Sequence, residues 1–136
     1  MAIPQVNRRK DPRYTDFNTS FTTHPVSGDL ARLEDFEAVR RSVRNLILTD
    51  KYERLLDPRI GSNIKKSLFE PMDGATTMIL QSDISECIKN YEPRAILDAV
   101  NVVPDFDRQT YYVDIRFRVT FSEQLGNVSL LLNRIR

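Results

Sequence analysis

The stretch NYEPRAILDAVNVVPDF, residues 90–106, decides the fold because the hydrophobic period changes inside it. A helical pattern runs into its first two residues, and a strand-like pattern follows at residues 96–103. Pro93 stands between the two patterns, where its fixed φ and its effect on the preceding residue end a helix. Glu92 and Arg94 flank this proline. The sequence therefore predicts a stiff helix-to-strand junction from which an acid and a base project.

Two long helices are predicted before this junction. Residues 35–48 carry apolar side chains at the spacing of one helical face, namely Phe36, Val39, Val43, Leu46 and Ile47. Residues 76–91 repeat the pattern with Leu80, Ile84, Cys87, Ile88 and Tyr91. A short helix at residues 64–69 lies between them and ends before Pro71.

After the junction the period is two. Residues 111–121 alternate apolar and polar side chains, which is typical of a strand with one buried and one wet face. Neighbouring strands are predicted at residues 96–103 and 128–134, joined by hairpin loops at 105–110 and 123–127. The expected fold class is α+β, with both long helices packed on a small, mainly antiparallel sheet that forms a three-stranded C-terminal meander.

The N-terminal segment reads as an extended basic arm at residues 1–15, followed by a single domain at residues 16–136. Phe17 and Phe21 alternate with polar residues and could add a short strand. The arm could meet phosphates, dock on a protein or be a solvated tail segment, and its cations are Arg8, Arg9, Lys10 and Arg13.

Composition argues against several classes of partner. The formal charge of the 136 residues is +1, which gives no general attraction to nucleic acid or to an anionic membrane. The apolar runs, such as residues 130–132, are far shorter than the ~20 residues of a membrane span. The N-terminus is charged where a signal peptide would be apolar. We expect no nucleic-acid or membrane partner.

The sequence carries no convincing catalytic constellation. His24 is the only histidine, so no histidine cluster can bind a metal. Cys87 falls on a helical apolar stripe and reads as a buried, inert thiol. Nothing in the spacing of the acids sets two apart for hydrolysis, among them Glu70, Glu92, Asp98, Asp105 and Asp107. We expect no catalytic residue, no metal and no cofactor.

Several short motifs together resemble a known family. They are Asp16-Phe17 with Phe21, SGDL at 27–30, AVRRSVRNLILT at 38–49, Glu53, DPRIG at 57–61, SLFEP at 67–71, the stretch beginning at residue 90, and YYVDIRFRV at 111–119. In this order they resemble the baseplate wedge protein family of contractile tails, some members of which carry a lysozyme label. The resemblance covers residues 16–121.

The resemblance implies a structural subunit rather than an enzyme. Members look like a small domain related to the part of the sheath that knits its subunits together. The implied role is to clamp the core bundle of neighbouring wedge proteins and to dock the first sheath ring. Hub or tube proteins are further implied contacts. The family's Glu-Pro-Arg motif corresponds to Glu92, Pro93 and Arg94, which would grip the core bundle, and Glu70 could add a contact. The expected location is the virion tail baseplate, assembled in the host cytoplasm.

Three alternatives stay open at this point. Glu92 and Arg94 could serve only the helix end, through local pairing and the last helical carbonyls. The chain could be the equivalent subunit of a type VI or other contractile injection system. It could also be a peptidoglycan hydrolase, which a muralytic assay would separate from a structural subunit.

Overall fold

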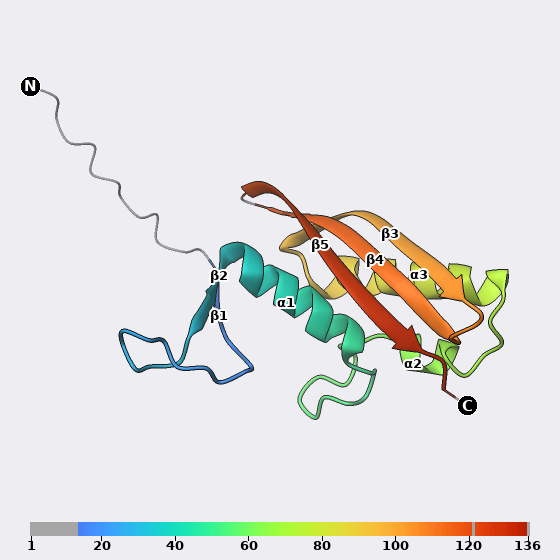
Figure 1. The fold of residues 1–136 in the computed structure, drawn as a ribbon, viewed down its shortest axis with the longest axis horizontal. Helices are drawn as coiled ribbons and strands as arrows, with labels where there is room; N and C mark the ends of the chain where they lie inside the picture. The colour runs from blue at the N-terminus through green and yellow to red at the C-terminus, as the bar shows by residue number, and fades with distance from the viewer. Residues whose placement is uncertain (1–13, 121, 136) are drawn as a thin grey trace, which may run out of the picture. The chain divides into compact units, whose positions relative to one another are not determined.

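The computed structural model describes residues 14–120 and 122–135 (Figure 1). The predicted arm at residues 1–15, with its basic cluster, therefore falls almost wholly outside the described residues. The chain divides into two compact units, the first ending at Ala38 and the second beginning at Val39. The single domain expected at residues 16–136 stays a prediction.

The first unit contains a small two-stranded sheet. Strand β1 (Thr15–Phe17) pairs antiparallel with β2 (Arg32–Glu34), and a bridge between Thr23 and Leu30 extends the hairpin. Phe17 lies in a short strand, as the sequence suggested. Phe21 does not, because it adopts a positive φ of 50° that a strand residue does not have.

The second unit carries helices and a three-stranded antiparallel sheet. Its helices are α1 (Asp35–Leu48), which begins in the first unit, α2 (Ile64–Ser67) and α3 (Gly74–Tyr91). Its strands, in the spatial order β3-β4-β5, are β3 (Ala95–Asp105), β4 (Thr110–Val119) and β5 (Ser122–Asn133). The predicted α+β class and C-terminal meander are confirmed.

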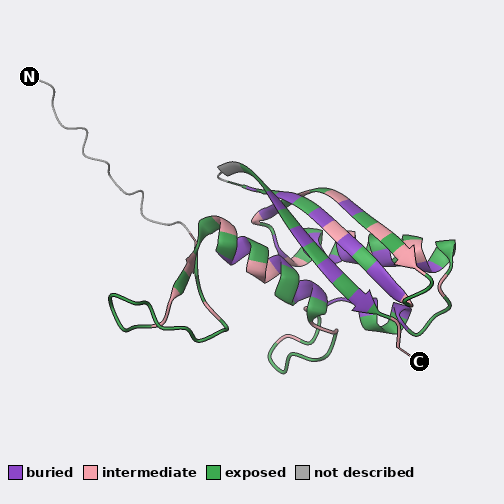
Figure 2. Cartoon of the chain, viewed as in Figure 1, coloured by how far each residue is buried: buried purple, intermediate pink, exposed green. Residues whose placement is uncertain are grey.

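The core lies on one face of this sheet. Every second residue of β4 from Tyr111 to Val119 is buried, whereas Tyr112, Arg116 and Arg118 face solvent (Figure 2). Because only this face is covered, the buried stripes of α1 and α3 must pack against it. The stripes predicted from helical spacing are buried at Val39, Val43, Leu46, Ile47, Leu80, Ile84, Cys87 and Ile88. The predicted stripe residues Phe36 and Tyr91 are only partly buried.

Several predicted boundaries differ from the structure, and three of the differences have consequences. Helix α3 begins two residues earlier than predicted, because the Asp73 carboxylate caps it by accepting the Thr76 N–H at 2.7 Å. Helix α2 ends at Ser67 rather than residue 69. The predicted loop at residues 123–127 is wrong, since these residues belong to β5. Gly126 is not a turn residue there but lies opposite the bulky Phe117.

Candidate functional site

The Glu-Pro-Arg junction lies where α3 ends and β3 begins. Glu92 is the C-cap of α3, and its N–H donates to the Ile88 carbonyl at 2.9 Å. Pro93 is exposed and its neighbours turn the chain into β3 at Ala95. The sequence-predicted break at Pro93 is thus found at the predicted place.

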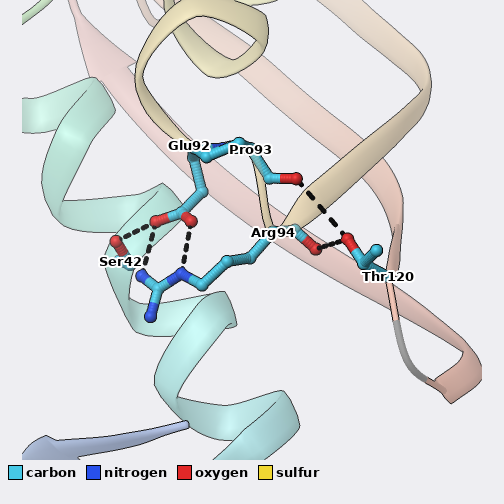
Figure 3. A network of polar contacts seen from close by, with 5 residues as sticks. All are labelled: Ser42, Glu92, Pro93, Arg94 and Thr120. Carbon is cyan, nitrogen blue, oxygen red and sulfur yellow. Dashed lines mark hydrogen bonds and ion pairs between the residues drawn. The ribbon is translucent and has the colours of Figure 1, made fainter.

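The Glu92 carboxylate is buried, with the residue only 2% exposed. Its two oxygens accept from the Arg94 guanidinium, at 2.6 Å from Nε to Oε1 and at 2.8 Å from Nη2 to Oε2 (Figure 3). The Ser42 hydroxyl, which comes from α1, donates to the same carboxylate. The acid and the base therefore bind each other in a bidentate pair, and α1 closes over it.

The electrostatics of the pair keep the acid ionised. Burial alone would raise the pKa of Glu92, but the hydrogen bonds from Arg94 and Ser42 and the charge of Arg94 outweigh burial. Together they hold the pKa of Glu92 below its ordinary value. The carboxylate can therefore fix the guanidinium in one orientation at neutral pH.

The backbone of the junction is fastened to the end of β4. The Thr120 N–H donates to the Arg94 carbonyl at 3.0 Å. The Thr120 hydroxyl donates to the same carbonyl at 2.9 Å (Figure 3). The Arg94 side chain is thus held by Glu92 and its backbone by Thr120. Its side chain stays 29% exposed, against 3% for that of Glu92. Arg94 and Pro93 are the members of the motif that solvent or a partner can reach.

Sequence reasoning missed Ser42 and Thr120. Ser42 could have been found, because it lies three residues after Val39 and four before Leu46 on the buried stripe of α1. A polar residue at such a position needs a partner. Thr120 could not be found, because its approach to Arg94 depends on the register of β3 against β4.

Glu70, the other predicted contact residue, lies apart from this network. It is exposed after α2, and its N–H donates to the Ser67 carbonyl at 3.2 Å. Within the described residues no hydrogen bond or ion pair joins the Glu70 side chain to the junction.

Two carboxylic acids meet at a small cavity that the sequence did not reveal. The cavity measures about 50 Å³ and is lined by polar residues that include Asp83, Glu86 and Lys51. Burial raises the pKa of Asp83 despite the nearby Lys51 charge. A space of this size accepts water but not a sugar ring.

Among the described residues, no cluster of three acids, histidines or cysteines could hold a metal ion. None of the described helices is both long and apolar enough to cross a membrane.

Comparison with known proteins gives one family. A family model described as "Baseplate wedge protein gp25" matches residues 33–124. The baseplate wedge protein gp25 of Enterobacteria phage T4 is 36% identical over 91 residues, which cover 67% of this chain and 69% of that protein.

Solved structures share the fold at lower identity. A Geobacter sulfurreducens protein whose description proposes a tail lysozyme superposes with a TM-score of 0.67 at 22% identity, over 72% of this chain and 89% of its own. A chain of the anti-feeding prophage baseplate superposes with a TM-score of 0.62 at 21% identity, over 90% of this chain and 87% of its own. At these identities the likeness shows the fold alone.

Proposed function

Because the chain belongs to the gp25 family of contractile-tail baseplate wedge proteins, we propose that it is a structural subunit with two docking surfaces. One surface grips the core bundle of neighbouring wedge proteins through Arg94. The other is a sheet edge that receives the first ring of sheath subunits. Hub or tube proteins are further contacts in this proposal, and the subunit assembles in the host cytoplasm before it reaches the tail baseplate.

The buried bidentate pair of Glu92 and Arg94 is the observation that supports the proposed core-bundle contact. Glu92 is too deeply buried to touch a partner, so its expected role changes from contact residue to positioning residue. It holds the guanidinium of Arg94 in one orientation, on the side of the junction where Ser42 of α1 lies (Figure 3). A side chain fixed before binding loses less conformational entropy when a partner docks. Planar guanidinium groups suit the carboxylates and carbonyl oxygens that a protein partner can offer.

The second surface is the outer edge of β5. In the described residues β5 pairs only with β4, so its other side can accept a strand from another chain. The Arg134 N–H donates to the Gln109 carbonyl at 2.9 Å, and pairs along an antiparallel ladder alternate between hydrogen-bonded and non-hydrogen-bonded. The register runs without a shift from Thr110↔Asn133 to Arg118↔Leu125. The backbone groups of residues 127, 129 and 131 therefore point outward.

The opposite edge, β3, is less suited to accept a strand. It carries Pro104, and its register against β4 shifts between Leu97 and Ala99. The Gln81 side chain of α3 donates to the Val100 carbonyl at 2.8 Å. Proline, bulges and covering side chains are the devices that blunt an edge strand. These features favour β5 as the docking edge.

A peptidoglycan hydrolase is not favoured. The T4 relative is a baseplate wedge protein, and the Geobacter structure supports only the fold. The cavity beside Asp83 and Glu86 is too small for a sugar, and the Glu92 carboxylate is occupied by Arg94 and Ser42. The proposal is therefore a subunit without enzymatic activity.

Depletion of this subunit tests the proposed function as a whole. Particles that lack the chain should contain tail tubes but few or no assembled sheaths, because the first sheath ring has no docking edge. Counting sheathed tails by electron microscopy measures the effect, and expression of the wild-type chain should restore them. Sheathed tails in normal number without the subunit would refute the proposal.

A further inference from the structure

The loop between α1 and α2 presents two leucines to solvent. Leu55 and Leu56 are exposed at 100% and 102%, the highest values among the large apolar residues described. Figure 1 shows this loop projecting away from the helices and sheet of its own unit, and Figure 2 shows that it is largely exposed. A contiguous exposed apolar patch on a soluble chain often marks a site where a partner docks.

The loop is built to hold its tip in place. At its base the Ser62 N–H donates to the Thr49 carbonyl at 2.8 Å. One level further out the Tyr52 N–H donates to the Pro58 carbonyl at 2.7 Å. Gly61 has a φ of 144°, and a Cβ there would lie 2.7 Å from the carbonyl carbon of Asp50, so only glycine allows this closure. The leucine tip is thus presented by a preorganised loop.

The charged residues near the two leucines differ in their partners. The Glu53 carboxylate accepts the Asp50 N–H at 2.8 Å, and the Asp57 carboxylate accepts the Arg59 N–H at 3.3 Å. Both acids are therefore engaged by the loop itself. Arg54, beside the leucines, forms no ion pair with any residue in the described part of the chain. The tip therefore combines two exposed leucines with a cation that takes part in none of the described ion pairs.

We infer that the loop tip, formed by Leu55, Leu56 and Arg54, docks on a neighbouring baseplate protein. Its binding site there would be an apolar socket with a carboxylate rim. The apolar pair fits a concave surface and the cation complements an acidic rim. A bilayer is a poorer fit, because two leucines offer about half the apolar carbon of a myristoyl chain, which alone binds membranes only reversibly. The inference rests on the assignment to a baseplate but not on Arg94 or the β5 edge.

Thiol labelling of a Leu55→Cys variant tests the inference in the assembled particle. The only native cysteine, Cys87, is 4% exposed, and burial raises its pKa to about 11, so it reacts slowly. A maleimide should label position 55 rapidly in the isolated chain and at least about tenfold more slowly in purified baseplates. A Ser82→Cys variant on the exposed side of α3 is the control and should label at the same rate in both.

Equal labelling of position 55 in the isolated chain and in the baseplate would overturn the inference, as would equal protection at position 82. Protection of the isolated chain by vesicles of phosphatidylethanolamine and phosphatidylglycerol would also overturn it, in favour of a bilayer. The readout concerns only the surroundings of the loop. It can fail while the Arg94 contact holds, and it can succeed where that contact is absent.

Discussion

An Arg94→Met variant is expected to lose roughly 3 kcal/mol of unfolding free energy at pH 7. Methionine keeps much of the side-chain volume, so the main change is the loss of the guanidinium. Glu92, which is 2% exposed, would keep the Ser42 hydroxyl but lose its charged partner. A buried carboxylate without a counter-charge is costly, because water no longer solvates it.

The same variant should reverse the pH dependence that Glu92 contributes. In the wild type, hydrogen bonds from Arg94 and Ser42 overcome burial and hold the pKa of Glu92 below 4.5. Its contribution to stability is then present above pH 4.5 and is lost as the pH falls through the folded-state pKa. Without the guanidinium, burial prevails and the pKa of Glu92 rises above its unfolded value. Stability should then fall as the pH rises above 4.5.

Urea unfolding of wild type and variant at about pH 4.5 and pH 7 measures both effects. The difference in unfolding free energy between the two proteins should be larger at pH 7. A difference that is equal at both pH values would show that Glu92 does not depend on Arg94. An Arg118→Met variant is a matched control, because Arg118 pairs with Asp98 at 2.8 Å but is 49% exposed. Its loss should stay within about 1 kcal/mol.

A Ser129→Pro variant is expected to abolish sheath assembly while the subunit stays folded and enters the baseplate. Residue 129 lies in the middle of β5, and its N–H points away from β4. Proline removes this outward donor and blocks an incoming strand, yet it leaves the bonds between β4 and β5 in place. Electron microscopy of tails assembled on the variant measures the effect, and sheathed tails should fall to near zero.

Two further variants distinguish a blocked docking edge from loss of the Ser129 hydroxyl and from loss of sheet stability. Ser129→Ala removes the hydroxyl that donates to Asp114 at 3.2 Å but keeps the N–H, so sheaths should assemble normally. Val128→Pro removes an inward donor and should destabilise the sheet itself. Normal sheaths on baseplates that contain the Ser129→Pro variant would exclude β5 as the docking edge.

The sequence predicted most of the fold because its hydrophobic periods are strong. Helix α1 has the predicted bounds, and β4 alternates as expected between buried and exposed residues. Residues 123–127 were predicted as a loop because Gly126 by itself indicates a turn. In the structure Gly126 lies in β5, opposite the large Phe117 side chain. That pairing depends on strand register, which local pattern does not determine.

The position of the Glu-Pro-Arg junction was predicted, but the hydrogen bonds that join its side chains were not. The break at Pro93 follows from local backbone chemistry, and it lies where the sequence indicated. The burial of Glu92 depends on Ser42, which is 50 residues away and reaches the carboxylate only when α1 packs beside the end of α3. Local sequence could therefore place Glu92 and Arg94 at one junction, but it could not show that one supports the other.

The most direct test of the account is the affinity of this chain for the purified core-bundle proteins of the same baseplate. Wild type, Arg94→Met and Arg118→Met are compared under conditions where circular dichroism shows all three folded. Removing Arg94 from a desolvated interface should cost roughly 2–5 kcal/mol, which weakens binding at least about thirtyfold. Arg118→Met should bind like wild type. Equal affinity of wild type and a folded Arg94→Met variant would contradict the proposed clamp.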